Sequence, residues 1–399
     1  MGAALPIDAL LPPPKVDLEA LRSGRLARLK AQIRAAGVDL LILTNPISLR
    51  YAIDFRTYAL FNAHIPTSYL FVSADGPTIL FGAYGPPPLV DEARIGRPIS
   101  FFDGGDALAT VAADFAGDVE DYLVEAGATG HRVAVEYVNP SITQALERRG
   151  IGVQDGVCIA ERARLIKLPE ELVCMRHAVA VAELGLQVVR DSIAPGVTET
   201  ALLAVFNAIN IAHDGDWQDG RMLASGPRMN PWCQEASPRP IQAGELVGLD
   251  TDMIGPFGYF ADISRTFFCG PGRPSARQKQ LYRIAVDEIE HNRTLIKPGL
   301  GFSDFAQAAY RVDPDFHANA YTCISHGAGM CDEYPRVNHP FREPAPYDGA
   351  YQAGMVITLE SYVGAVGEPD GVKLEQQILI TEDGSEPLST FPYEDVLLE

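Results

Sequence analysis

Residues 248–266 read Gly-Leu-Asp250-Thr-Asp252-Met-Ile-Gly-Pro-Phe-Gly-Tyr-Phe-Ala-Asp262-Ile-Ser-Arg-Thr266. We interpret the first part as a strand. Asp250 and Asp252 are two positions apart in it, so both side chains should leave the same face, about 6.6 Å apart. A Gly/Pro turn follows, and a hairpin would place Asp262 beside the first strand. The stretch therefore predicts two neighbouring strands that carry three acidic side chains.

Two more acids interrupt apolar runs that are typical of strands. Glu360 ends the run from Met355, and Glu375 lies within residues 371–380, while His326 lies between the two acidic regions. A single acid in a strand is most often an outward, solvated residue, and sequence spacing does not show that these residues converge. If they do, each carboxylate pair about 4 Å apart repels by about 4 kcal/mol at an effective dielectric of 20, so cations would be required. Oxygen ligands with one imidazole suit Mn, Fe, Co or Zn in a two-metal site.

The overall charge excludes some classes of protein. The 399 residues include 32 Lys and Arg against 52 Asp and Glu, a formal net charge of −20. Nucleic acids and anionic membranes are bound through clustered basic residues, so we expect neither as a partner. No uninterrupted apolar run is long enough to span a bilayer, and the six cysteines are scattered without a CxxC pair. We therefore expect a cytoplasmic location.

The pattern of predicted elements divides the chain in two. Helical periodicity over residues 18–36 ends at Gly37, and short β-rich runs follow, which predicts an α/β N-terminal domain over residues 1–155. A linker is expected at residues 156–168. Pro169 then opens a long helix to about Ser192, because proline is favoured at the first helical position. A C-terminal α+β domain is expected over residues 169–399, with helices at 199–212, 275–295 and 302–310.

The order of the acidic residues and the histidine resembles a known family. Asp252, Asp262, His326, Glu360 and Glu375 are similar in order and local context to the metal ligands of the pita-bread metallohydrolases, the superfamily of methionine aminopeptidase, prolidase, aminopeptidase P and creatinase. Residues 45–51 and 164–167 also look like the N-terminal signature and the linker of that superfamily. The resemblance implies a creatinase-like α/β N-terminal domain, a C-terminal pita-bread catalytic domain and a homodimer.

Two departures distinguish this chain from the peptidases of the superfamily. Asp332 stands where those peptidases carry a substrate-handling histidine, and a second histidine is missing from the loop at residues 224–235. Both departures resemble one branch, the DddP-type dimethylsulfoniopropionate (DMSP) lyases. Residues 225–235 and 326–333 match the blocks Ser-Gly-Pro-Arg-x-Asn-Pro-Trp-x-Gln-Glu and His-Gly-x-Gly-x-Cys-Asp-Glu of that branch.

This second resemblance implies specific roles. Asp250 would join the five ligands as a sixth, Asp332 would be the general base, and Tyr321 falls where that branch has a substrate-binding tyrosine. Trp232 is a further candidate for binding the substrate, because aromatic faces hold cations such as a sulfonium. The two divalent ions would be iron, with Mn, Zn or Co as alternatives. The expected reaction is the base-catalysed β-elimination of a small zwitterion, DMSP, to dimethyl sulfide and acrylate. A free aspartate is a weak base with a pKa near about 3.9, so Asp332 would need a raised pKa.

Alternatives remain open on the sequence. The chain could instead be an Xaa-Pro dipeptidase, an aminopeptidase P-like enzyme or a creatinase-like metallohydrolase. A pseudoenzyme that uses the pita-bread pocket only for binding is a third hypothesis. The replacement of His by Asp at position 332 favours the lyase, because elimination expels a neutral sulfide and needs no acid for the leaving group.

Overall fold

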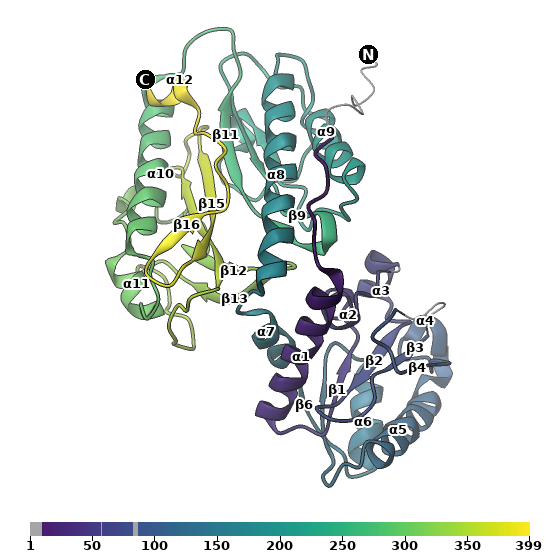
Figure 1. The fold of residues 1–399 in the computed structure, drawn as a ribbon. Helices are drawn as coiled ribbons and strands as arrows, with labels where there is room; N and C mark the ends of the chain where they lie inside the picture. Colours follow the sequence, from purple (N-terminus) through teal and green to yellow (C-terminus); the bar gives the residue numbers. More distant parts are fainter. Residues whose placement is uncertain (1–9, 57, 83–86) are drawn as a thin grey trace. The chain divides into compact units, whose positions relative to one another are not determined.

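The computed structural model describes residues 10–56, 58–82 and 87–399. Its contacts divide them into two compact units: residues 17–164, and residues 165–399 together with residues 10–16 (Figure 1). The predicted linker at 156–168 is largely a helix, α7 (Val157–Arg164), which belongs to the N-terminal unit. Residues 10–16 belong instead to the C-terminal unit.

The N-terminal unit contains a mixed six-stranded sheet in the order β4-β3-β2-β1-β5-β6. Strand β1, inside the sheet, pairs antiparallel with β2 and parallel with β5. Aromatic side chains of β2, β3 and helix α5 (Leu108–Glu125) fill the core beside the sheet, where the Phe71 and Phe115 rings meet edge to face with their centroids 5.8 Å apart. The strands are β1 (Leu40–Leu43), β2 (Tyr69–Val72), β3 (Ile79–Phe81), β4 (Glu92–Arg94), β5 (Arg132–Val135) and β6 (Gly152–Asp155).

Local capping explains where the N-terminal helices begin and end. Asp17 accepts a hydrogen bond from the Ala20 N–H at the start of α1, and Gly37 ends this helix in the left-handed conformation. Asn45 and Asn139 cap α2 and α6 in the same way, each before a proline. The helices are α1 (Leu18–Ala36), α2 (Pro46–Ile53), α3 (Ala59–His64), α4 (Phe101–Gly104), α5 (Leu108–Glu125) and α6 (Pro140–Arg148), with a 3-10 turn at Gly105–Ala107.

The C-terminal unit is built on antiparallel sheets. A three-stranded sheet has the order β11-β8-β7, and a five-stranded sheet has the order β13-β12-β14-β15-β16. A short hairpin of β9 and β10 leaves the end of β8. The strands are β7 (Leu223–Ser225), β8 (Leu246–Asp250), β9 (Met253–Ile254), β10 (Phe260–Ala261), β11 (Ser264–Phe268), β12 (Ser325–Ala328), β13 (Asp332–Val337), β14 (Val356–Val363), β15 (Val372–Ile380) and β16 (Ser385–Pro387).

Among the described residues of this unit, five helices accompany the sheets. The longest begins at Pro169, as predicted, and its neighbour begins after the N-cap Thr198. Ser275 and Gln278 form a capping box at the start of α10, which packs on β14 and β15. The helices are α8 (Pro169–Ser192), α9 (Glu199–Ala212), α10 (Ala276–Leu295), α11 (Phe302–Ala308) and α12 (Asp395–Leu398), with 3-10 turns at Gly226–Arg228, Pro256–Gly258 and Pro314–Phe316.

Helix α8 is long and apolar enough to cross a membrane. The sequence did not single it out, because charged residues interrupt its apolar run. Half of the most apolar 18-residue stretch of this helix is buried inside the structure, and the helix packs against α9 and β10. A buried core helix passes the same test of length and composition.

The strand expected to carry both Asp250 and Asp252 is shorter than predicted. Strand β8 ends at Asp250, and Asp252 lies in the following turn with a φ of 37°. The intervening Thr251 hydroxyl donates to the Ala261 carbonyl across the hairpin and holds the turn in place. The prediction that both acids share one strand face was therefore wrong, although the predicted hairpin is present.

Candidate metal centre

Five elements of the C-terminal unit bring one histidine and five acids together. Asp250 and Asp252 lie at the end of β8 and just after it, and Asp262 lies between β10 and β11. His326 is on β12, while Glu360 and Glu375 are directly opposite each other on β14 and β15. Two groups of ligand atoms each lie within 4.8 Å of one another, and they share Asp262: Asp262, His326, Glu375, and Asp250, Asp252, Asp262.

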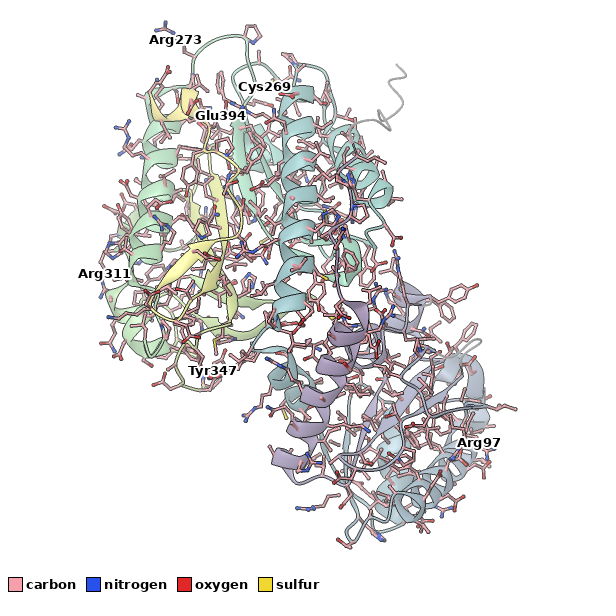
Figure 2. All side chains as sticks on the ribbon, viewed as in Figure 1. Arg97, Cys269, Arg273, Arg311, Tyr347 and Glu394 are labelled. Atoms are coloured by element: carbon pink, nitrogen blue, oxygen red, sulfur yellow. The ribbon has the colours of Figure 1, made fainter. Side chains whose placement is uncertain are left out.

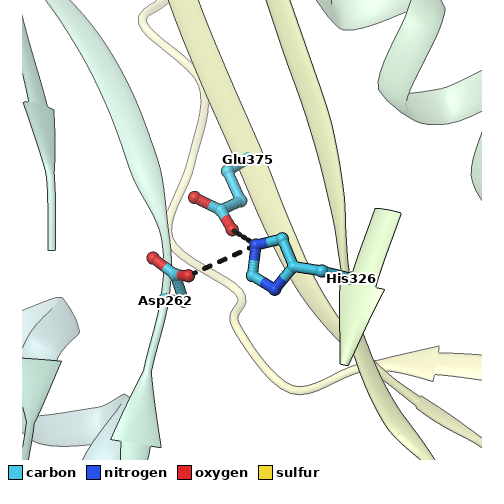
Figure 3. A group of neighbouring side chains, drawn as sticks. All are labelled: Asp262, His326 and Glu375. Carbon is cyan, nitrogen blue, oxygen red and sulfur yellow. Dashed lines mark ion pairs between the residues drawn. The ribbon is translucent and has the colours of Figure 1, made fainter. Parts of the chain in front are cut away.

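His326 lies at the centre of the first group. Its Nε2 is 3.7 Å from both Asp262 Oδ2 and Glu375 Oε1 (Figure 3). The same nitrogen is 3.2 Å from Glu360 Oε1. One imidazole nitrogen thus faces three carboxylates that come from three different strands or loops. This is the arrangement of donors that a divalent ion would bind.

A buried ammonium lies on the other side of the glutamates. Lys373 Nζ is 3.0 Å from Asp250 Oδ2, 2.6 Å from Glu360 Oε2 and 3.2 Å from Glu375 Oε2, and its side chain is fully buried. The ammonium donates at 2.6 Å to Ser264 Oγ, which in turn donates to Glu375 Oε2. A fixed positive charge therefore offsets part of the negative charge of the cluster.

The protonation of the cluster shows that this compensation is incomplete. Burial, together with the charge of the neighbouring carboxylates, raises the pKa of Asp252, Asp262 and Glu375 well above the usual range. Burial acts in the same direction on Asp250, but the Lys373 ammonium holds the pKa of that carboxyl below its usual value. Burial lowers the pKa of His326, but the hydrogen bond with Glu360 and nearby negative charges outweigh it, so this pKa is raised.

Unpaired oxygens indicate where cations would bind. Asp250 Oδ1, Asp262 Oδ1 and Glu375 Oε1 are buried and make no hydrogen bond with any described residue. A buried carboxylate oxygen without a partner is costly, and a metal ion that displaces the retained protons would remove that cost. The donor set of hard oxygens and one imidazole therefore fits two divalent ions.

Neighbouring residues hold the ligands in position. The Asp262 N–H donates to Gln377 Oε1 at 3.1 Å, and the Asp219 N–H donates to the Asp252 carbonyl at 2.9 Å. A Cβ at Gly220 would overlap the carboxylate of Asp252, so only glycine permits that approach. These contacts fix the loop that carries Asp252 against its neighbours.

Asp332 differs from the other acids because it is accessible. It is the first residue of β13, its side chain is 67% exposed, and its Oδ1 lies 3.2 Å from His326 Nδ1. Partial desolvation and the charges of Glu360 and Asp250 raise the pKa of Asp332, while His326 opposes this shift. The structure thus places a carboxyl with a raised pKa at the edge of the cluster, as a general base requires.

The two predicted substrate-binding residues lie in different surroundings. The Tyr321 ring is 4.8 Å from Lys373 Nζ and so borders the cluster, and the charge of Glu360 raises the pKa of its hydroxyl. Trp232 is 6% exposed in the hydrophobic core and stacks on Tyr362, with their ring centroids 6.3 Å apart. Its indole Nε1 is buried and makes no hydrogen bond with any described residue, and its predicted substrate-binding role stays a prediction.

Two residues of the site were missed from the sequence alone. Lys373 is two positions before Glu375, so both side chains leave the same face of β15, and this spacing could have indicated it. Cys233 follows Trp232, has a φ of 73°, and is close enough for Lys373 and Asp250 to affect its pKa, which burial raises. No sequence signal separated Cys233 from the other cysteines.

Comparison with known proteins defines the class. The profile of Metallopeptidase family M24 matches residues 173–382, and the chain belongs to this family. The Xaa-Pro dipeptidase from Bacillus anthracis has a similar structure, with a TM-score of 0.74 and 22% identity over 94% of this chain and 99% of that one. The prolidase from Pyrococcus horikoshii has a TM-score of 0.70 over 93% of this chain and 99% of that one, with 18% identity. The predicted fold class is confirmed.

Two curated relatives match almost the whole chain. Dimethylsulfoniopropionate lyase DddP of Roseovarius nubinhibens is 36% identical over 96% of this chain and 88% of its own length. The protein of the same name from Roseobacter denitrificans is 34% identical over the same shares. The predicted resemblance, to the superfamily and to its DddP branch, is confirmed.

Proposed function

We propose that this protein is a metal-dependent carbon–sulfur lyase that cleaves DMSP to dimethyl sulfide and acrylate. Sequence identity of 34–36% with the two DddP relatives, in alignments that cover 96% of the chain, supports the proposal. The observation that carries it is the position of Asp332, an accessible carboxyl 3.2 Å from the imidazole of the cluster. The six predicted ligands would hold the ions: Asp250, Asp252, Asp262, His326, Glu360 and Glu375.

Asp332 is suited to remove a proton from carbon. Four of the candidate ligands are almost fully buried: Asp250, Asp262, Glu360 and Glu375 are each at most 3% exposed. By contrast, a substrate can approach Asp332 from solvent. In the proposed reaction, Asp332 takes the proton alpha to the substrate carboxylate. The electron pair of that C–H bond forms the C=C bond, and the C–S bonding pair leaves with neutral dimethyl sulfide.

The bound ions, with iron favoured among them, would supply positive charge to balance the negative charge that develops on the substrate carboxylate. His326 would hold the Asp332 carboxylate in place through its Nδ1. The raised pKa of Asp332 brings its basicity closer to that needed at neutral pH.

Tyr321 is a candidate for the sulfonium end of the substrate. Its ring already lies over a cation, the Lys373 ammonium at 4.8 Å. Aromatic faces bind cations without needing a counter-charge that would compete with the metal ions. Trp232 remains the second predicted substrate-binding residue, and its indole Nε1 makes no hydrogen bond with any described residue.

The direct test is the release of dimethyl sulfide. Metal-loaded protein is incubated with DMSP, and headspace dimethyl sulfide is measured beside a chelator-stripped sample and a sample reloaded with iron. We expect gas from the loaded and reloaded samples only. Equal gas from the stripped sample, or none from any sample across Fe, Mn, Zn and Co, would contradict the proposal.

The second candidate is hydrolysis of Xaa-Pro dipeptides, favoured by the structural likeness to the Bacillus anthracis dipeptidase. Against it, Asp332 occupies the position at which the superfamily's peptidases carry a histidine. Release of proline from Ala-Pro by the same metal-loaded samples distinguishes the two. Proline release without dimethyl sulfide would replace the lyase by a dipeptidase.

A further inference from the structure

A cavity lies in the C-terminal unit at the edge strand β13. It has a volume of about 250 Å³ and lies between α11, β13 and the segment that follows β13. Water occupies about 30 Å³ per molecule in the liquid, so the space equals about eight waters. None of the six candidate metal ligands lines it, and neither do Asp332 and Tyr321.

The cavity contains buried polar groups without partners. Both ring nitrogens of His339, the Arg342 Nε and the Asn338 Oδ1 make no hydrogen bond with any described residue. His339 is 2% exposed, and its ring stacks on Phe341 with the centroids 4.7 Å apart. Buried polar atoms are normally paired, and a group of four around one cavity indicates a missing partner.

The charge of the lining selects the kind of partner. Two arginines, Arg336 and Arg342, line the cavity, and no acidic residue in the described part of the chain does, although the whole chain has a net charge of −20. Glu343 and Asp348 flank the cavity in sequence but are exposed and do not line it. Burial lowers the pKa of His339 to about 3, so this ring is neutral at pH 7 and has one N–H donor and one acceptor.

The rest of the lining is apolar. Phe302, Ala306, Val337 and Pro344 are among the residues that surround the space. A free phosphate or sulfate would leave these walls without contacts, whereas an organic anion would bury its carbon atoms against them. Arg342 already uses Nη2 to donate to the Ala320 carbonyl at 2.6 Å, so the guanidinium is fixed with its Nε free.

We propose that this cavity binds a small organic carboxylate, whose oxygens accept from the Arg342 Nε–H and a ring N–H of His339. The proposal does not depend on the reaction at the metal centre, because the two sets of residues are separate. Asn338 Oδ1 would accept from a hydroxyl group on ligands that carry one. The apolar walls would contact the carbon chain of the ligand.

Propionate is a suitable probe, and isothermal titration calorimetry of the metal-loaded full chain is the measurement. Propionamide has the same shape without the charge, and inorganic phosphate has charge without the carbon chain. The Arg342→Gln variant removes the proposed contact, and Arg273→Gln is the matched control. Arg273 is exposed at the opposite end of the same unit from Tyr347, which lines the cavity (Figure 2).

We expect a propionate-binding component that weakens by about tenfold or more in Arg342→Gln and is unchanged in Arg273→Gln, as for the loss of one charge-assisted hydrogen bond. Propionate at the metal centre would bind equally to both variants and would not imitate this result. If Arg342→Gln fails to fold, Asn338→Asp decides, because it adds a negative charge at the same cavity and should weaken binding similarly. The proposal is overturned if no component depends on position 342 or 338, if propionamide binds as tightly, or if phosphate binds and propionate does not.

Discussion

In the N-terminal sheet, Ile42 of β1 faces Phe71 of β2, and in the C-terminal sheet, Glu360 of β14 faces Glu375 of β15. All four side chains are at most 1% exposed. The apolar pair stabilises its unit, since burying each such side chain contributes about 1.5–3 kcal/mol. Like charges directly opposite each other in a sheet are destabilising. Burial therefore favours folding in one sheet and opposes it in the other, which indicates that the second pair serves binding.

The C-terminal unit offsets this cost in part with its own residues. Lys373 lies within 3.2 Å of carboxylate oxygens of Asp250, Glu360 and Glu375. The remaining unpaired oxygens, such as Asp262 Oδ1, are left for an external cation. The comparison thus separates a region held by packing from a region that needs a ligand to complete its charge balance.

The largest effect is expected from Asp332→Asn, which removes the proposed base and leaves the buried acids in place. We expect DMSP cleavage to fall by about 10²–10⁴-fold, the usual contribution of a general base. Because the Asp332 side chain is 67% exposed, thermal unfolding should change little. The control is Asp287→Asn, an exposed acid on α10. Retained activity in Asp332→Asn would remove Asp332 from the mechanism.

Phe71→Ala tests the packed region. The Phe71 ring is fully buried and contacts the rings of Tyr69, Phe81, Phe115 and Tyr122. We expect a loss of about 3–5 kcal/mol in the free energy of unfolding, measured by urea denaturation, with the bound metal content unchanged. Phe102→Ala, which truncates a ring that is 67% exposed, should cost far less. Equal costs for the two variants would mean that the sheet core does not stabilise the unit as described.

Lys373→Gln tests the charge balance. It leaves three buried carboxylates without their internal cation, and breaking a buried ion pair costs about 3 kcal/mol or more. We expect this loss in chelator-treated protein and a smaller loss in the metal-loaded form, because the ions supply positive charge. Unfolding in urea with and without metal measures both, and Lys297→Gln, at an exposed position, is the control. A cost that is the same with and without metal would contradict the balance between Lys373 and the ions.

Much of the fold could be predicted because local signals agree with the final structure. The helix from Leu18 ends at Gly37, and the helix from Pro169 ends at Ser192, as expected from caps and periodicity. The convergence of the acids could not be derived from spacing, because it depends on how separate strands pair. The positions of Asp250 and Asp252 show the limit, since the turn after β8 brings both near Asp262 without a shared strand.

The predicted site lacked Lys373, and there is a physical reason for this. The spacing of Lys373 and Glu375 could have placed both on one face of a strand, but a lysine near acids is normally a solvated surface residue, and its burial follows from the pairing of β14 with β15. The surroundings of Trp232 were likewise not predictable from the sequence, because its stacking on Tyr362 depends on how distant segments pack, and its substrate-binding role stays a prediction.

The smallest effect is expected at Glu288, a buried acid outside the ligand set that tests whether burial of charge is costly elsewhere in the same unit. Burial raises the pKa of Glu288 to about 8, and its only described hydrogen-bond partner is Ser361 Oγ at 2.6 Å. Between the unfolded and folded pKa values, the folded state binds more protons than the unfolded state, so stability falls as pH rises from about 4.5 to 8. Glu288→Gln should remove this slope and gain about 2 kcal/mol at pH 6.5 relative to pH 5. Urea unfolding at both pH values measures it, with the exposed Glu382→Gln as control, and an unchanged pH slope would show that Glu288 ionises as readily as a surface acid.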